Sequence, residues 1–155
     1  MPRYRFDSGE GRFRVRYAGD AQRVMMRERF DEVARIVSAA ELDLRLVELS
    51  GTLRVLDLRH ERNLDALGLD DQINTSRAPG VWAACQRLGD LIVDWYGERC
   101  HGIVYRSRTT PRRSANLAFF AHAPLAIRSL GPLSRHDDLL TASVLADGFT
   151  VESWS

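Results

Sequence analysis

Apolar and polar positions alternate near the N-terminus, and this pattern predicts a strand followed by a helix. Three arginines in residues 11–17 alternate with Phe13, Val15 and Tyr17, which is typical of a strand with one dry face. A turn follows, and Asp20 is a suitable N-cap for a helix over residues 20–38. An apolar stripe along this helix is expected to pack on the core: Met26, Phe30, Val33 and Val37.

Short apolar runs bounded by turn residues predict six more strands. They cover residues 44–49, 52–58, 101–105, 117–121, 125–130 and 149–152. The run at 52–58 alternates, which is typical of a half-buried strand. The run at 101–105 is mostly apolar and predicts a central strand. The last run is expected at a sheet edge.

Helical spacing of apolar residues predicts the remaining main elements. Residues 62–67 form a short helix that ends at Gly68, a suitable C′ residue. Residues 81–96 form the second main helix, with seven apolar residues at helical spacing. A last helix begins at Asp137 or Asp138 and runs to residue 146.

Two polar segments between these elements are candidates for functional loops. Residues 69–80 are turn-rich, and a long loop in a small domain is often functional, although flexible surface also fits them. Residues 106–116 carry four arginines and five side chains with oxygen atoms. This second loop fits a phosphate-binding segment and equally a solvated connection between strands.

About three helices interleave unevenly with six or more short strands, which indicates an α+β fold with a mixed or antiparallel sheet. The length fits a single domain, residues 1–155, with a core of ordinary size. No glycine-rich phosphate loop follows a predicted strand, so neither a Rossmann nor a P-loop nucleotide site is expected.

Composition narrows the range of functions. The formal net charge is only +1 and all 22 basic residues are arginine, so neither a global basic field for nucleic acid nor a Schiff-base lysine is available. Cys85 and Cys100 do not form a metal-binding spacing with the four histidines, and buried free thiols are expected. The sequence has no apolar run of transmembrane length and no signal peptide, which predicts a cytoplasmic protein.

A candidate site lies at the corner between the first strand and the first helix. Tyr17 leaves the strand and Glu28 lies eight residues into the helix, so both side chains are expected to overhang one corner, where clefts form. Arg5, just upstream, offers a planar fork of donors to an anion. The same residues fit a half-buried tyrosine, a solvated carboxylate and ordinary surface arginines, and these residues alone leave both interpretations open.

The order of several short motifs resembles the RES domain family, which is named for its arginine, glutamate and serine. Arg5 with the next two residues resembles the arginine motif, Tyr17 begins a Tyr-Ala motif, and Glu28 follows Tyr17 by eleven residues as in the family. Other matching segments are LRVLDL at 53–58, ACQRL at 84–88, and GIVYRSR at 102–108 followed by Asn116 and Phe119. The specificity lies in their order over residues 4–150.

This resemblance implies an ADP-ribosyltransferase-like fold and an NAD⁺-degrading toxin that needs no metal. The implied reaction is phosphorolysis or hydrolysis of the nicotinamide–ribose bond, with inorganic phosphate as a candidate co-substrate. Alternatives from other classes are an ADP-ribosyltransferase acting on a macromolecule and a non-catalytic module that binds a nucleotide or a partner protein. The implied partner is an Xre-like antitoxin, and a homodimer is also compatible with the resemblance. Direct binding to nucleic acid or to a membrane is not expected.

Residue roles also follow from the resemblance. Glu28 is implied to stabilise charge on the ribose during catalysis. Arg5, Tyr17, Ser107 and Asn116 are implied to bind the substrate. In this binding mode Arg5 contacts the pyrophosphate, Tyr17 lies against nicotinamide and Ser107 contacts the ribose. Family members usually have an additional segment before the arginine motif, whereas this sequence has only four residues before Arg5. Arg5 is therefore expected near a free end, where order is least assured. Arg12 is a second candidate for the same role.

Overall fold

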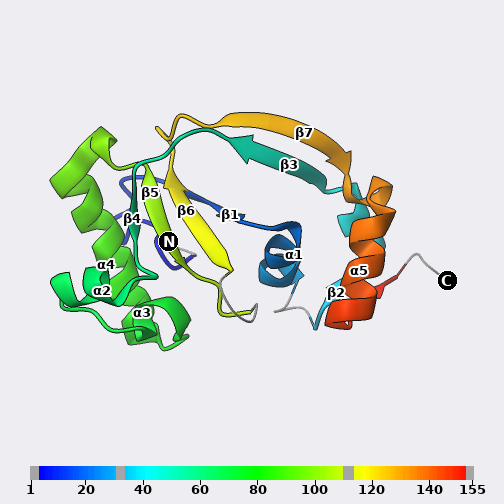
Figure 1. Ribbon diagram of the computed structural model, residues 1–155, viewed down its shortest axis with the longest axis horizontal. Coiled ribbons are helices and arrows are strands. Elements are labelled where there is room, and N and C mark those ends of the chain that lie inside the picture. The colour runs from blue at the N-terminus through cyan, green and yellow to red at the C-terminus, as the bar shows by residue number, and fades with distance from the viewer. Residues whose placement is uncertain (1–3, 31–33, 110–113, 153–155) are drawn as a thin grey trace.

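A mixed four-stranded sheet lies at the centre of the larger part of the molecule in the computed structural model, which describes residues 4–30, 34–109 and 114–152 (Figure 1). Its strands run in the order β1 (Val15–Gly19), β6 (Ala115–Phe120), β5 (Gly102–Arg106) and β4 (Val55–Asp57). β4 and β5 are parallel, whereas the other two pairs are antiparallel. The α+β fold with a mixed sheet is confirmed, and β5 is an interior strand as its sequence predicts.

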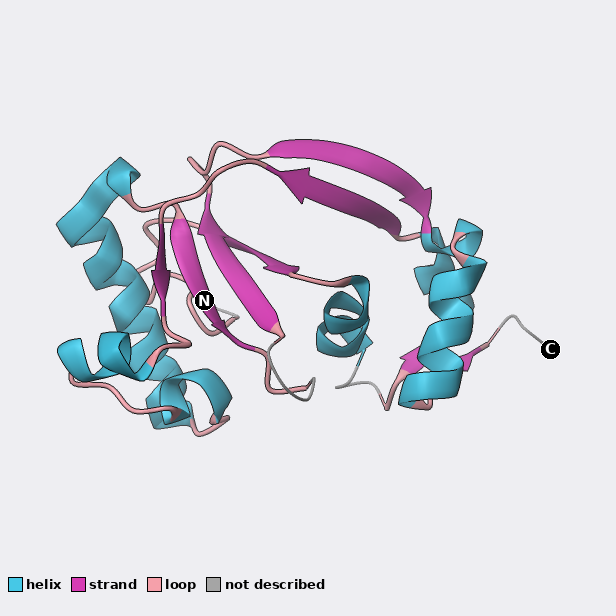
Figure 2. Ribbon diagram, in the orientation of Figure 1, coloured by secondary structure: helices cyan, strands magenta, loops and turns pink. Residues whose placement is uncertain are grey.

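Helix α4 (Pro79–Tyr96) packs against this sheet, with the shorter helices α2 (Glu61–Ala66) and α3 (Gln72–Thr75) close to it (Figure 2). Ile92 of α4 meets Ile103 of β5 and Phe6 of the N-terminal segment in one apolar core, and all three are buried. Burying a side chain of this kind contributes about 1.5–3 kcal/mol. The core therefore gives the sheet a firm backing.

A second apolar core lies away from this sheet. It joins helix α1 (Gln22–Phe30) to helix α5 (Asp137–Asp147), next to the parallel pair β2 (Ile36–Val37) and β8 (Thr150–Val151). Its buried members include Met26, Phe30, Leu140 and Phe149. Segments from both ends of the sequence therefore fix the helix that carries Glu28.

An antiparallel ribbon of β3 (Arg45–Ser50) and β7 (Ala126–Pro132) connects the two parts of the molecule (Figure 1). Its register shifts between Leu46 and Val47. Short 3₁₀ turns flank these elements: η2 (Ala39–Asp43), η3 (Gly97–Arg99) and η4 (Leu133–Arg135). The ribbon brings the residues just before β3 close to α1.

Many predicted elements occur close to their expected bounds. The bounds of helices α2, α4 and α5 and of strands β3, β5, β6 and β7 agree with the predicted segments to within about two residues, while β4 is shorter than predicted. Gly68 has the positive φ, 64°, of a C′ residue, and its amide donates to a carbonyl of the last turn of α2. Both cysteines are free and buried, as predicted. Within the described ranges, no helix is long and apolar enough to cross a membrane.

The first helix is shorter than predicted. Its described part is Gln22–Phe30 rather than residues 20–38, and Val33, which the pattern places in the core, falls outside the described residues. The next described residues, Ala34 and Arg35, have φ values of 58° and 57°, which no right-handed helix allows. Val37 is buried in β2 against β8 instead of in a helix. Pairing with β8, from the C-terminal end of the chain, thus outweighs the helical spacing of apolar residues that predicted a helix here.

The structure also corrects the predicted start of the first strand and the predicted N-caps of the first and last helices. The first strand begins at Val15 rather than at residue 11, because the chain before it folds against α4, where Asp90 accepts a hydrogen bond from the Ser8 hydroxyl at 2.6 Å. The Asp20 carboxylate, predicted to cap α1, accepts the Ala115 amide of β6 at 3.0 Å. The N-cap of α5 is His136, not Asp137 or Asp138.

Candidate active site

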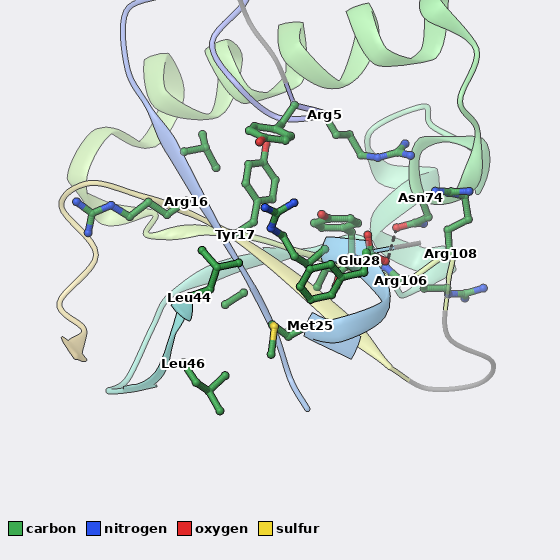
Figure 3. Close-up of a pocket in the computed structure, with 18 of the residues that line it drawn as sticks. Arg5, Arg16, Tyr17, Met25, Glu28, Leu44, Leu46, Asn74, Arg106 and Arg108 are labelled. Atoms are coloured by element: carbon green, nitrogen blue, oxygen red, sulfur yellow. Dashed lines mark hydrogen bonds between the residues drawn. The ribbon is translucent and has the colours of Figure 1, made fainter. Parts of the chain in front are cut away.

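A cavity of about 780 Å³ opens between the sheet and helix α1. Its size falls within the range of about 300–1,000 Å³ that is typical of small-molecule sites. The lining comes from the N-terminal segment, β1, α1, α3, α4, the residues around β3, β5 and β6. In the view of Figure 3, Arg106 and Arg108 lie on the side of Glu28 that faces Asn74, and Leu44 and Leu46 lie on the opposite side.

Glu28 projects from the last turn of α1 and is exposed at the cavity. Two hydroxyl groups from the segment after β5 donate hydrogen bonds to its Oε1 atom: Ser107 at 2.8 Å and Thr109 at 2.9 Å. Among the described residues, Oε2 of Glu28 accepts no hydrogen bond. The carboxylate is thus held on one side and open on the other.

Tyr17 stands on β1, with its side chain among the cavity-lining residues. Its hydroxyl accepts the Phe6 amide at 2.9 Å and donates to Asp7 Oδ1 at 3.4 Å. Burial raises the pKa of Tyr17 well above its ordinary value, and the charge of Asp7 adds to this, although the Phe6 amide opposes it. The phenol is therefore neutral at physiological pH, and it presents a ring rather than a base to the cavity.

Arg5 is buried, with 8% of its surface exposed, although only four residues precede it in the sequence. Its guanidinium donates to the carbonyl oxygens of Ile73 at 2.7 Å and Ser76 at 2.9 Å, and it lies 5.8 Å from the centre of the Trp82 ring. Within the described part of the chain no carboxylate pairs with it. Arg5 is therefore immobilised by neutral partners, and its positive charge is uncompensated at the cavity.

Arg12, the second candidate for the anion clamp, lies elsewhere. It pairs with Asp94 at 2.6 Å and with Glu10 at 3.0 Å, and its third ion pair is with Asp90 at 3.3 Å. It does not line the cavity. Of the two arginines, Arg5 therefore lines the cavity and Arg12 does not.

Tyr105 and Asn116 face one another across β5 and β6 and both line the cavity. Both residues are buried. Burial raises the pKa of Tyr105, and the nearby charge of Glu28 raises it further, while Arg5 lowers it. Tyr105 is therefore a neutral group between the site's anion and its buried cation.

Asn74 is a site residue that lies inside the segment predicted to be a loop. It belongs to the short helix α3 and is 1% exposed. Its amide nitrogen donates to the Leu58 carbonyl at 3.0 Å, and its amide oxygen accepts the Arg106 amide at 3.1 Å. Asn74 thus ties α3 to the ends of β4 and β5, beside Ser107.

The charges that line the cavity are strongly unbalanced. Glu28 is the single acidic residue among the described lining residues, which include six arginines: Arg5, Arg16, Arg29, Arg45, Arg106 and Arg108. Arg29 and Arg106 have carboxylate neighbours in Glu41 and Asp71. Arginine is well suited to phosphate groups because its planar fork donates two parallel hydrogen bonds. The cavity therefore suits a ligand that carries phosphates.

Four of the five predicted site residues line this one cavity: Arg5, Tyr17, Glu28 and Asn116. The fifth, Ser107, is bound directly to Glu28. Sequence reasoning missed Thr109, Asn74, Tyr105 and Trp82; the hydroxyl-rich composition of the segment after β5 was the available signal for Thr109. Residues 110–113 of that segment lie outside the described residues. In the parts of the chain that the structure describes, no three His, Cys, Asp or Glu side chains gather as a metal site would require.

Comparisons with known proteins agree with this architecture. The family model for the RES domain matches residues 2–141. A chain in the crystal structure of the M. tuberculosis MbcT–MbcA toxin–antitoxin complex is similar, with a TM-score of 0.58 and 22% sequence identity over 83% of this chain and 72% of that chain. No curated protein matches the sequence at a significant level. At this identity the structural likeness supports the fold.

Proposed function

The chain belongs to the RES domain family, and on this premise we propose that it is a toxin that destroys NAD⁺ by breaking the bond between nicotinamide and its ribose. One observation carries the proposal: a single carboxylate, Glu28, stands in an arginine-lined cavity, anchored through one oxygen and open at the other. NAD⁺ presents a cationic nicotinamide-ribose next to a pyrophosphate. In this proposal the Glu28 carboxylate complements the cationic nicotinamide-ribose, and the lining arginines complement the pyrophosphate.

The carboxylate supports the difficult part of this reaction. Nicotinamide leaves as a neutral molecule and needs no proton, but positive charge develops on the ribose as the bond breaks. A fixed anion beside that charge stabilises the transition state more than the ground state, which is what accelerates a reaction. In this proposal the open Oε2 of Glu28 faces the ribose.

The other site residues bind the rest of NAD⁺ in this proposal. Arg5 attracts the pyrophosphate, since its charge has no carboxylate partner within the described residues. The neutral ring of Tyr17 lies against nicotinamide and keeps water away from it. Asn116 and Ser107 provide hydrogen bonds at the ribose end.

The acceptor in the proposed reaction is inorganic phosphate. A phosphate oxygen forms the new bond to the ribose carbon, the carbon–nitrogen bond breaks, and its electron pair neutralises the nicotinamide ring. Phosphate releases its proton to solvent, and the products are nicotinamide and ADP-ribose-1″-phosphate. Arg108 supports this choice, since it lines the cavity next to Ser107 and has no ion pair among the described residues.

A toxin of this kind needs an inhibitor, and we include one in the proposal. The MbcT–MbcA structure is described as a toxin–antitoxin complex, and a corresponding small Xre-like antitoxin is the expected partner of this chain. The arginine-lined cavity mouth is an electrostatically favourable place for an acidic partner.

Product analysis tests the proposed reaction. Purified protein is incubated with NAD⁺ in phosphate buffer and in phosphate-free buffer, and the products are separated by chromatography. We expect nicotinamide and ADP-ribose-1″-phosphate with phosphate, and much slower loss of NAD⁺ without it. Free ADP-ribose in both buffers would identify a hydrolase, and ADP-ribose attached to an added macromolecule would identify a transferase. Intact NAD⁺ with a folded protein would overturn the proposed function.

A further inference from the structure

The Thr109 hydroxyl is a second anchor of the Glu28 carboxylate, and we propose that Thr109 is the positioning residue that holds this carboxylate in its reactive orientation. The inference rests on the proposed function, in which Glu28 is the catalytic carboxylate. Thr109 Oγ1 donates to Glu28 Oε1 at 2.9 Å, and its own oxygen lies 3.3 Å from Ser107 Oγ. Thr109 acts through Glu28 and does not itself touch the substrate.

Burial separates the roles of the two hydroxyl residues. Thr109 is 8% exposed, whereas Ser107 is only partly buried. A buried hydroxyl without a partner is costly, so the Thr109 hydroxyl is tied to its hydrogen bond with Glu28. Ser107 lies nearer to solvent. Thr109 is therefore the inner anchor and Ser107 the outer one.

Proton counting shows why two anchors are needed. Each hydroxyl has one proton to donate, and both Ser107 and Thr109 direct theirs to the same atom, Glu28 Oε1. If Ser107 turns its proton toward a ribose oxygen, it gives up its hold on Glu28. Thr109 then keeps Oε1 in place, so that Oε2 still faces the ribose. A preorganised charge of this kind needs no rearrangement when the bond breaks.

The position of Thr109 supports the same division of labour. Ser107 and Thr109 are two residues apart in the segment that leaves β5, and both side chains reach a helix about 80 residues earlier in the chain. The helix itself is fixed from its other side by Asp147 of α5. Glu28 therefore stands between a fixed backbone and a fixed inner hydroxyl.

Steady-state kinetics on the full chain test this inference. Thr109→Val keeps the shape of the side chain and removes the hydroxyl, while Thr109→Ser keeps the hydroxyl and removes a methyl group. We expect Thr109→Val to lower kcat about tenfold with KM for NAD⁺ within about twofold, and Thr109→Ser to restore kcat to within about threefold of wild type. Thr75→Val is the matched control: that hydroxyl donates to the Asp71 carbonyl, does not contact Glu28 and is expected to leave kcat unchanged.

The outcomes separate this inference from the proposed function. Wild-type kcat in Thr109→Val, or a Thr109→Ser variant as slow as Thr109→Val, would overturn the positioning role. Crystal structures of wild type and Thr109→Val add a readout that does not depend on turnover. In Thr109→Val we expect the Glu28 carboxylate either to rotate or to adopt more than one orientation. A carboxylate with the same single orientation as in the wild type would contradict the inference. A wild-type protein that leaves NAD⁺ intact would overturn the proposed function, and the crystal structures would still decide the role of Thr109.

Discussion

Helix α1 connects two carboxylates that are held in opposite ways. On one side, Asp147 of α5 is 5% exposed and accepts hydrogen bonds from the guanidinium groups of Arg23 and Arg27, the shortest at 2.6 Å. On the other side, Glu28 is exposed at the cavity and bound by two neutral hydroxyls. The first carboxylate has its charge compensated at close range, and the second does not.

The difference shows what each carboxylate can do. An anion surrounded by arginines stabilises the packing of α1 on α5 but has little attraction left for a ligand. Neutral hydroxyl donors fix the orientation of an anion without cancelling its charge. The same helix is thus anchored by one carboxylate and presents the other to the cavity.

The largest expected effect concerns Asp147. Replacing it with asparagine leaves two arginines without their buried counter-charge, and we expect the free energy of unfolding to fall by about 2–4 kcal/mol. Urea unfolding followed by circular dichroism measures this loss. Glu28→Gln is the matched comparison, since it is expected to change stability by less than about 0.5 kcal/mol. Equal destabilisation by both variants would show that the two carboxylates do not differ as described.

The two candidates for the anion clamp, Arg5 and Arg12, are expected to differ in their effect on substrate binding. We expect Arg5→Met to raise KM for NAD⁺ about 10- to 100-fold, because charge-assisted contacts to phosphate oxygens contribute about 1.5–3 kcal/mol. Arg12→Met removes ion pairs outside the cavity and is expected to leave KM unchanged. Steady-state kinetics of both variants, with melting temperatures as a folding control, provide the measurement. An increase in KM for Arg12→Met alone would place the anion clamp outside this cavity.

Tyr17 and Tyr105, which both line the cavity, give the folding stability a predictable response to alkaline pH. Folding raises the pKa of Tyr17 and of Tyr105 above the unfolded value near 10. Their contribution to stability is complete below about pH 10 and is lost as the pH rises beyond it, because the unfolded chain then releases the protons first. Each tyrosine is expected to reduce the unfolding free energy by about 1.4 kcal/mol per pH unit in that range.

Urea unfolding between pH 9 and 11 tests this response. Tyr17→Phe is expected to remove one tyrosine's share of the slope. Tyr96→Phe, at an exposed position on α4, is the control and is expected to leave the slope unchanged. A slope that is the same in Tyr17→Phe as in wild type would show that Tyr17 ionises as readily in the folded protein as in the unfolded chain.

Local sequence patterns predict the parts of the fold that depend on near neighbours. The period of 3.6 residues identifies α4, and the corner of β1 and α1 follows from a strand pattern directly before a helix pattern. Tyr17 and Glu28 are predicted together for this reason. Arg5 is predicted through its motif, but its hydrogen bonds to Ile73 and Ser76 depend on how α3 packs.

Contacts between distant segments explain what the sequence does not predict. The meeting of Glu28 with Ser107 and Thr109 requires the sheet order that places β6 and β5 beside β1, and that order is set by long-range pairing. Val37 has helical spacing but pairs with β8, more than 100 residues away. Asp147 shows no local sign that it binds the arginines of α1.

The rate of NAD⁺ loss in the wild type, Glu28→Gln and Glu48→Gln tests the central claim most directly. Glu48 is an exposed glutamate on the β3–β7 ribbon, paired with Arg128, and its variant controls for the loss of a carboxylate elsewhere. The account predicts that Glu28→Gln lowers the rate about 100-fold or more, with an unchanged melting temperature, and that Glu48→Gln keeps the wild-type rate. A folded Glu28→Gln protein that consumes NAD⁺ as fast as wild type would contradict the account.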